Sequence, residues 1–461
     1  MGACAPEFSH FSTEVGGGDD PRESRITHHD SRPLLEWPTA SMASSPPTSA
    51  APGVRAKIPR AMLPALILLA LSAFLNFVDR GNLSIAAPML QDELGLSPGR
   101  LGTLFSSFFW TYASFQLVSG WLVDRFDASW VIAAGFLLWS AATAATGLVH
   151  TVALLLVLRL LLGMGESVAY PSYSSILARH YPESQRGFAN SIIITGFYAG
   201  PAFGLFFGGI LMGRYGWRPF FIILGLASFA WLFPWLHWMP RGQSSRAGKA
   251  PVAPSVFQIL RVPSVWGTFA SLFFLNYLQY FFITWLPFYL VRGRHFPMNR
   301  MAVIAGGSYF SCAVTAAICG RLSDWWIRRG VSPTLVRKAF TSGGMAGAAI
   351  FAFAAVLTGP GFSTAAVILT TSFLGMSSSN VWAITQALAG PQAAGRWTGL
   401  QNFVGNFAGI VAPNVTGLVL DHTGSFFWPF AITAVMCLLG AASWIFLIGP
   451  VTQVEWAVGQ E

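Results

Sequence analysis

Charge is scarce in this sequence of 461 residues, since Asp, Glu, Lys and Arg together make up only 10% of it. Soluble domains carry about 25% charged residues, whereas 54% of this chain is hydrophobic. These proportions exclude an ordinary soluble protein and indicate one that lies largely within a lipid bilayer. The net charge of +9 would suggest a nucleic-acid partner in a soluble protein. Here we assign it to basic loops beside the membrane, and we expect no nucleic-acid partner.

Cysteine is rare as well. The chain has four, Cys4, Cys312, Cys319 and Cys437, which show no metal-ligand spacing, and the last three lie in apolar runs. This pattern argues against a disulfide framework and against a zinc site, so we expect no bound metal and no cofactor.

A signal peptide is also missing, because the first long apolar run begins near Ala61 and is too long for the apolar region of a signal peptide. The preceding residues 1–60 are rich in Ser, Pro and His and show no apolar periodicity. We expect them to form a disordered cytoplasmic tail.

Long apolar runs are abundant. A transmembrane helix needs about 20 mostly apolar residues, and twelve segments meet that standard. They are 61–88, 101–123, 130–149, 152–177, 188–212, 217–239, 263–290, 301–321, 338–357, 361–388, 397–420 and 425–448. The sequence therefore predicts an all-helical, multi-pass protein of the cell (inner) membrane, expected to be a monomer. Its two six-helix halves are 61–239 and 263–448, joined by a polar, basic cytoplasmic linker at 240–262 and followed by a short tail at 449–461.

Basic residues set the expected orientation. With the N-terminus inside, the loops expected to face outward hold few basic residues. These are Arg100, Arg214, Arg218, Arg292, Arg294 and Arg300. The loops expected to face the cytoplasm hold about twice as many, so we expect both termini on the cytoplasmic side.

An internal repeat links the two halves. GWLVDRF, with Gly120, Asp124 and Arg125, follows the second span, and GRLSDWW, with Gly320 and Asp324, follows the eighth. The first copy resembles the G-x-x-x-D-R loop of the major facilitator superfamily, although Asp127-Ala128 departs from the pattern after it. The resemblance implies a twelve-helix transporter fold in which these residues serve gating loops.

Four ionisable side chains remain inside the spans: Asp79 and Arg80 in the first, and Arg159 and Glu166 in the fourth. Each costs about 2.5–3.5 kcal/mol on insertion scales, so four unpaired charges would oppose insertion by about 10–14 kcal/mol. They must therefore pair or face a wet cavity, as a structural salt-bridge cluster or as a path for substrate and protons. We favour the path.

Spacing refines this hypothesis. Arg159 and Glu166 are two turns apart on one helical face, with Gly163 between them leaving room for a neighbouring helix or a ligand. Burial favours a protonated carboxyl and a nearby arginine favours an ionised one, a competition suited to a proton-coupled carrier. An arginine stays charged, so it suits an anionic substrate. The polar Asn76 and Asn82 are expected to keep the first span wet.

A narrower resemblance rests on NFVDRGNLSIAAP, RLLLGMGESVAYPS, NYLQYFFITWLPFYL and GLQNFVGNFAGIVAP. These runs resemble the anion:cation symporter branch of the superfamily, which includes hexuronate, aldonate and sialin-like organic-anion carriers. The resemblance covers about residues 61–448 and implies proton-coupled uptake of a small organic anion. It implies that Asp79 and Glu166 titrate, that Arg80 holds the substrate and that Arg159 tunes Glu166.

Further polar residues of the spans are candidates for substrate contacts. Tyr112 and Gln116 match family positions that line the site, and the others lie one turn apart or close together on the seventh, tenth and eleventh spans. These are Tyr280, Thr284, Asn380, Trp382, Gln386 and Asn402, with Asn406 as a tuning residue. Any one of them could instead form an interhelical hydrogen bond.

One motif conflicts with uptake. Gly196, Gly200, Gly204 and Gly208 form a small-residue stripe that suits close helix packing. Gly200-Pro201-x-x-Gly204 also resembles the signature of proton-driven drug exporters, but Leu205 replaces the final glycine.

The sequence thus favours a proton-coupled symporter of a small organic anion, such as a sugar acid or similar carboxylate, working by alternating access. Drug export and a ligand sensor that transports nothing are the alternatives, and we expect no enzyme.

Overall fold

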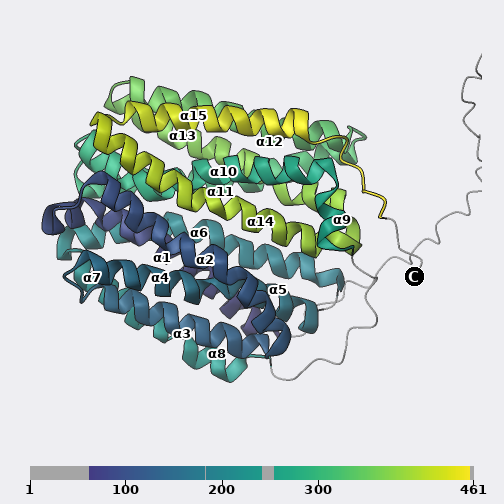
Figure 1. The fold of residues 1–461 in the computed structure, drawn as a ribbon, viewed down its shortest axis with the longest axis horizontal. Helices are drawn as coiled ribbons and strands as arrows, with labels where there is room; N and C mark the ends of the chain where they lie inside the picture. The colour runs from purple at the N-terminus through teal and green to yellow at the C-terminus, as the bar shows by residue number, and fades with distance from the viewer. Residues whose placement is uncertain (1–61, 182, 241–253, 457–461) are drawn as a thin grey trace, which may run out of the picture. The chain divides into compact units, whose positions relative to one another are not determined.

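A computed structural model describes residues 62–181, 183–240 and 254–456 of the chain. These residues are almost entirely helical, and no strand occurs among them (Figure 1). The tail expected at 1–60 lies outside the described residues, and so does most of the linker expected at 240–262. The described end of that linker contains a short helix, α9 (Val256–Leu260).

The N-terminal half contains eight helices in the described residues. They are α1 (Leu63–Leu94), α2 (Pro98–Arg125), α3 (Ala128–Thr146), α4 (Val152–Ser167), α5 (Ala169–His180), α6 (Glu183–Tyr215), α7 (Trp217–Phe229) and α8 (Leu232–Trp238). Helices α4 and α5 together make one span, and α7 and α8 make another. The half therefore crosses the membrane six times.

The C-terminal half consists of α10 to α15 with two π-helical ends. These are α10 (Pro263–Phe288), η2 (Tyr289–Gly293), α11 (Met298–Arg328), α12 (Pro333–Leu357), α13 (Pro360–Ser378), α14 (Val381–Thr423), α15 (Phe427–Ala442) and η3 (Ser443–Leu447). Gly390, with φ of 64°, divides α14 sharply. Residues 360–390 form the tenth span and residues 392–423 the eleventh.

Eleven helical segments of the described chain are long and apolar enough to cross a membrane. The remaining predicted span is α2, which is 28 residues long but carries Thr111, Tyr112 and Gln116 among its apolar residues. A helix of that length reaches about 42 Å, more than the hydrocarbon core requires. The prediction of an all-helical fold with twelve spans in two halves is confirmed.

Two spans break because of proline. Pro171 has no N–H to donate to the carbonyl of Ser167, and its ring crowds that carbonyl. The fourth span accordingly divides between α4 and α5 at Val168, two residues after Glu166. Pro234 acts in the same way between α7 and α8. The first of these breaks ends α4 directly beside a buried carboxyl group.

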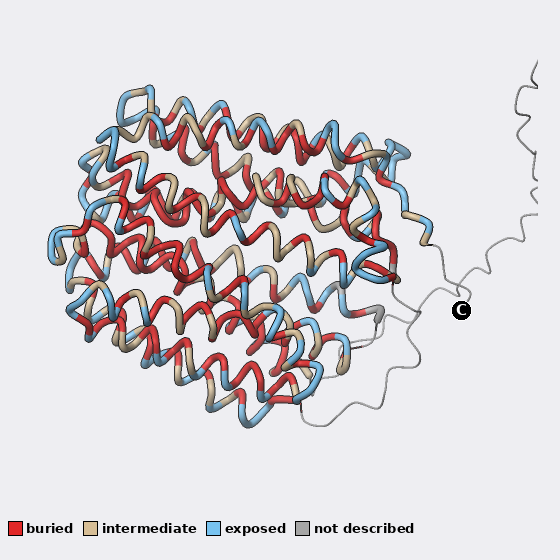
Figure 2. The backbone as a smooth tube through the Cα atoms, in the orientation of Figure 1, coloured by how far each residue is buried: buried red, intermediate tan, exposed pale blue. Residues whose placement is uncertain are grey.

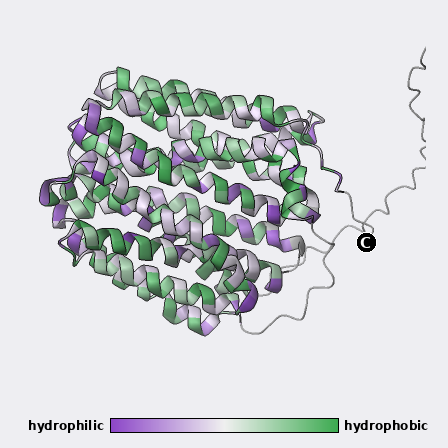
Figure 3. Cartoon of the chain, viewed as in Figure 1, coloured by the Kyte–Doolittle hydropathy of each residue, from purple (hydrophilic) through white to green (hydrophobic). Residues whose placement is uncertain are grey.

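The two halves lie side by side, with the purple-to-teal helices of the first below the green-to-yellow helices of the second (Figure 1). They meet where α2 contacts α14, α6 contacts α11 and α1 contacts α10. Buried residues gather between the helices (Figure 2), and hydrophobic residues predominate along the helices, with hydrophilic ones more frequent at their ends (Figure 3). Large apolar side chains such as Phe233 and Phe446 are exposed, as a lipid-facing surface requires.

The glycine stripe of the fifth span is a packing face. A Cβ added to Gly196 would meet the backbone of Ala70, and one added to Gly200 would meet the carbonyl of Phe74 at 2.6 Å. Both contacts belong to α1. The close approach of α6 and α1 thus explains the stripe without a role in drug export.

Gly163 admits a neighbouring helix, which is one of the two roles that the sequence left open. A Cβ at this position would collide with the backbone carbonyl of Phe108 in α2. We therefore expect Gly163→Ala to lower the free energy of unfolding by about 1–3 kcal/mol through overpacking. Thermal melting of the purified protein in detergent measures the effect.

Gly307 is the matched control because a Cβ there would have no neighbour within 4 Å. Alanine is the better helix former by about 0.5–1 kcal/mol, so Gly307→Ala should melt at the same temperature as the parent or higher. Equal melting of the two variants would contradict the packing role of Gly163.

Candidate functional site

A cavity of about 2310 Å³ opens at one end of the bundle, between the two halves. Side chains from α2, α5 and α6 line one wall, and side chains from α11, α13 and α14 line the other. Its mouth lies at the helix ends that carry most of its charged lining residues. These are Asp124, Arg125, Arg179, Arg186, Arg321 and Arg396.

Contacts between the halves close the opposite end. The Asp421 carboxylate accepts hydrogen bonds from the Ser97 hydroxyl at 2.9 Å and from the Gly99 backbone N–H at 2.8 Å, at the first turn of α2. Arg292 forms an ion pair with Asp92 of the other half. The cavity is therefore accessible from one end only, which is the end that basic-residue counting predicts to face the cytoplasm.

The four intramembrane charges are all buried in the N-terminal half. The Nε atom of Arg80 in α1 donates to Oε2 of Glu166 in α4 at 3.0 Å. The side chain of Glu166 is 0% exposed and that of Arg80 7%. Since a buried pair gains little net stability over apolar residues of similar size, such a pair suggests a functional role.

Aromatic rings surround the Arg80 guanidinium. Its Cζ atom lies 4.4 Å from the ring centre of Tyr112, 4.6 Å from that of Phe77 and 5.2 Å from that of Phe108. A cation over ring faces is attracted to them and is poorly hydrated there. Arg80 is thus held in place by rings on several sides and by one carboxylate.

Arg159 is not at ion-pair distance from Glu166, and its role in tuning Glu166 through its charge stays a prediction. Two turns along a helix amount to about 10.5 Å, too far for contact between side chains on the same face. No carboxylate within the described residues lies at ion-pair distance from Arg159, which contacts the ring of Phe108. The nearest charge partner of Glu166 comes instead from the neighbouring helix α1.

Several buried polar atoms around this pair have no hydrogen-bond partner within the described residues. Oδ1 of Asp79 accepts only a long bond of 3.5 Å from Asn82. The unpartnered atoms are Nδ2 of Asn76, Oδ2 of Asp79, Oδ1 of Asn82, Nε of Arg159 and Oε1 of Glu166. Each such atom costs about 1–3 kcal/mol. A cluster of them is unfavourable for stability and is consistent with a site that exchanges protons or ligands.

Amide side chains connect the two halves at the inner end of the cavity. Asn402 and Asn406 of α14 each lie 3.5 Å from Oε1 of Gln116 in α2. The Tyr280 hydroxyl donates to Oδ1 of Asn406 at 2.7 Å. Gln116 and Asn402 line the cavity, so this network separates it from the layer that contains Tyr280.

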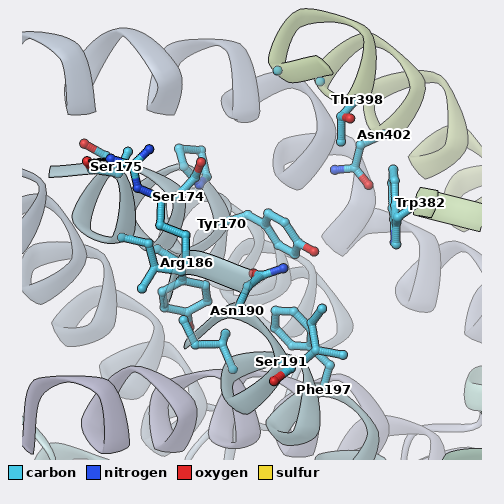
Figure 4. Close-up of a pocket in the computed structure, with 18 of the residues that line it drawn as sticks. Tyr170, Ser174, Ser175, Arg186, Asn190, Ser191, Phe197, Trp382, Thr398 and Asn402 are labelled. Atoms are coloured by element: carbon cyan, nitrogen blue, oxygen red, sulfur yellow. Dashed lines mark hydrogen bonds between the residues drawn. The ribbon is translucent and has the colours of Figure 1, made fainter. Parts of the chain in front are cut away.

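The other candidate contacts divide into two groups. Trp382 and Gln386 line the cavity, and Trp382 is labelled in Figure 4. Thr284 is buried and donates to the carbonyl of Tyr280 in its own helix at 2.6 Å. Asn380 is buried and accepts from Ser323 of α11 at 2.8 Å. Neither Thr284 nor Asn380 is among the residues that line the cavity.

The repeated loop motifs lie at the mouth. Gly120, Asp124 and Arg125 line it at the end of α2. A Cβ at Gly320 would lie 4.0 Å from Ser379, so α11 and α13 run close together there. Asp324 is exposed. The roles of these residues in gating stay predictions.

Sequence reasoning missed an aromatic part of the wall. Tyr170 of α5 stacks on Phe197 of α6, with ring centres 5.4 Å apart and planes 13° apart, and both line the cavity (Figure 4). Tyr170 follows the intramembrane carboxyl group of Glu166 by four residues, across the break at Val168. That spacing was the available signal.

These features together are those of a membrane transporter: two six-helix halves, a cavity between them closed at one end, and buried charges in one half. The sequence profile described as Major Facilitator Superfamily matches residues 69–413. The chain belongs to this superfamily and is a multi-pass membrane transporter, not an enzyme.

Similar proteins of known name are transporters. The chain is 30% identical over 410 residues to a probable sulfoacetate transporter of Cupriavidus necator, covering 84% of this chain and 94% of that one. It is 28% identical over 407 residues to the hexuronate transporter of Bacillus subtilis, covering 84% and 95%. It is 31% identical over 399 residues to a probable chloroplastic anion transporter of Oryza sativa subsp. japonica, covering 82% and 67%.

Solved structures confirm the fold. The chain is similar to a bacterial homolog of the human lysosomal transporter Spinster, in an inward-facing and unoccupied conformation. The TM-score is 0.73 at 19% sequence identity, and the match covers 84% of this chain and 97% of that one.

Proposed function

We propose that this protein carries a small organic anion, such as a sugar acid or similar carboxylate, together with protons by alternating access. The observation that carries the proposal is the buried ion pair between Arg80 and Glu166, whose guanidinium contacts Tyr112, one helical turn from the cavity-lining Gln116. Relatives named as transporters of sulfoacetate and hexuronate support an anionic substrate. No cofactor is needed, because the proton is the coupling ion.

The Arg80–Glu166 pair can couple proton binding to anion binding, because Arg80 can exchange the Glu166 carboxylate for the carboxylate of the substrate. While Glu166 is ionised, its carboxylate occupies the Arg80 guanidinium. A proton on Glu166 removes that negative charge and leaves Arg80 as an uncompensated buried cation, which is costly. A substrate carboxylate can then take the place of Glu166. Proton and anion therefore bind together, and each favours the binding of the other.

Asp79 and Arg159 complete the charge balance. With both carboxyl groups ionised, the four buried side chains sum to zero, so a proton and a monoanion together leave that sum unchanged. Neutrality matters because moving net charge through the membrane interior is expensive. Asp79, whose Oδ2 has no partner, is the second proposed proton carrier.

Reorientation requires the closed end to open. The contacts of Asp421 with Ser97 and Gly99 would separate, as would the ion pair of Arg292 with Asp92. At the other end, the helix ends that carry the arginines of the cavity mouth would move together and close the cavity. Rocking of two halves around a site between them is the general mechanism of such folds.

An uptake screen in proteoliposomes tests the function. Under an inward proton gradient we expect accumulation of at least one acid from a panel of gluconate, glucuronate, succinate and benzoate, relative to protein-free vesicles. We expect no accumulation of a cationic dye such as ethidium. Collapse of the gradient with a protonophore should stop accumulation. Net outward movement of the dye under the same gradient would instead support the exporter.

A further inference from the structure

The surface of the cavity around Tyr170 and Phe197 is dominated by aromatic rings. The Tyr170 side chain is 39% exposed and stacks on Phe197. Trp382 of α14 belongs to the other half and also lines the cavity (Figure 4). The wall therefore offers ring faces from both halves at the level where Gln116 and Asn402 end the cavity.

Some polar side chains of the wall are engaged with one another, while Asn190 and Thr398 line the cavity without a hydrogen bond within the described residues (Figure 4). Oε1 of Gln116 faces the amide nitrogens of Asn402 and Asn406. The hydroxyls of Tyr198 and Ser378 lie 3.2 Å apart across the two halves. A ligand hydroxyl that displaced one of these contacts would have to replace the lost bond, because a buried hydroxyl without a partner is costly.

The aromatic wall leads to the charge that would hold an anion. The ring of Phe197 lies 4.9 Å from that of Phe77, centre to centre, and Phe77 lies 4.6 Å from the Arg80 guanidinium. Tyr112, also against Arg80, is one turn from Gln116 in the cavity wall. Packed rings thus lie between the open cavity and Arg80, which does not itself line the cavity.

Charged lining residues lie at the mouth and not at this level. The lining residues of α5 and α6 near Tyr170 and Phe197 are neutral, whereas the arginines belong to the helix ends. A single anionic group directed to Arg80, attached to an apolar flat body, matches this distribution. A second charge on the body would face rings.

We propose that the transported anion is an aromatic monocarboxylate whose ring packs between the Tyr170–Phe197 wall and Trp382 while its carboxylate binds Arg80. This inference rests on the proposed function, which it narrows by substrate class. Rings stacked in offset or edge-on contact attract one another beyond simple area burial. The hydroxyl groups of a sugar acid would find no partners where they lay against these ring faces.

Equilibrium binding to the purified protein in detergent tests the substrate class. The probes are phenylacetate and benzoate against gluconate and glucuronate, all monoanions at neutral pH. We expect at least tenfold tighter binding of the aromatic acids, and uptake above protein-free vesicles only for them. Equal or tighter binding of gluconate or glucuronate would overturn the aromatic class while leaving proton-coupled anion transport intact. Failure of every acid to bind would overturn the proposed function itself.

Variants of the wall test the residues. Phe197→Gln should weaken phenylacetate binding about tenfold, through the lost ring contacts, and leave any weak gluconate binding within twofold. Phe188→Gln is the matched control on the same helix, since Phe188 is exposed and does not line the cavity. Trp382→Leu tests the opposite wall independently and should also weaken phenylacetate about tenfold. Unchanged phenylacetate binding in both wall variants would overturn the proposal.

Discussion

Replacing Glu166 with glutamine should abolish accumulation of the substrate against its gradient while leaving substrate binding measurable. The carboxylate is fully buried and accepts from Arg80 at 3.0 Å. Glutamine keeps the shape and one acceptor oxygen but has no charge and no titratable proton. Binding should become less dependent on pH, and facilitated exchange of substrate across the membrane should persist. Uptake and exchange in proteoliposomes at several external pH values measure both effects.

Glu93→Gln is the matched control for this variant. Glu93 also pairs with an arginine of its own half, Arg218 at 2.6 Å, but its side chain is 41% exposed at the closed end. An exposed pair contributes only about 0–1 kcal/mol, so accumulation should remain near the parent level. Full accumulation by Glu166→Gln would remove Glu166 from the coupling role.

Replacing Arg80 with alanine should weaken binding of the transported anion by a factor of 100 or more. The substitution removes a buried guanidinium that is held within a cage of rings. A charge-assisted hydrogen bond contributes about 1.5–3 kcal/mol, and a bidentate contact adds a second one. Equilibrium binding of the best substrate from the uptake panel measures the loss. Arg218→Ala, which opens the exposed pair, should bind normally.

For Arg80→Ala, a loss of thermal stability must be distinguished from a loss of substrate binding. Arg80→Ala leaves Glu166 buried without its partner, a change that costs about 3–5 kcal/mol. The double variant Arg80→Ala/Glu166→Gln removes both charges and should recover most of the lost thermal stability without recovering binding. If the double variant bound the anion as tightly as the parent, Arg80 would have no role in substrate recognition.

The spans could be predicted from the sequence because bilayer thickness imposes a length and an apolar composition on each of them. The prediction even included α2, whose Tyr112 and Gln116 make it more polar than the other spans. Those two residues turn towards the other half and the Arg80 site, which accounts for the polarity. The helix breaks near Pro171 and Pro234 are also predictable from the sequence, because proline lacks the backbone N–H that a continuous helix needs.

The site was predictable only in part. Counting charges within the spans identified Asp79, Arg80, Arg159 and Glu166, all of which are buried. It did not identify which of them pair, because partners on different helices depend on helix rotation, which spacing along one helix does not determine. The Tyr170–Phe197 wall was missed for a related reason: an aromatic residue in an apolar span has the same composition whether it faces lipid or a cavity.

The glycine contacts within the N-terminal half bear on how the protein moves. Gly163 brings α4 against the backbone of α2, and Gly196 and Gly200 bring α6 against that of α1. Where two helix backbones are in direct contact, no side chain lies between them that could change rotamer. Each of these helix pairs therefore moves as a rigid unit. Between the halves, Gly102 and Gly417 bring α2 and α14 together backbone to backbone, whereas amide side chains join the same two helices at 3.5 Å beside the cavity. The seam between the halves is therefore tight at its closed end and joined by side chains beside the cavity, so opening the closed end requires the glycine contacts of α2 and α14 to separate while each half moves as a unit.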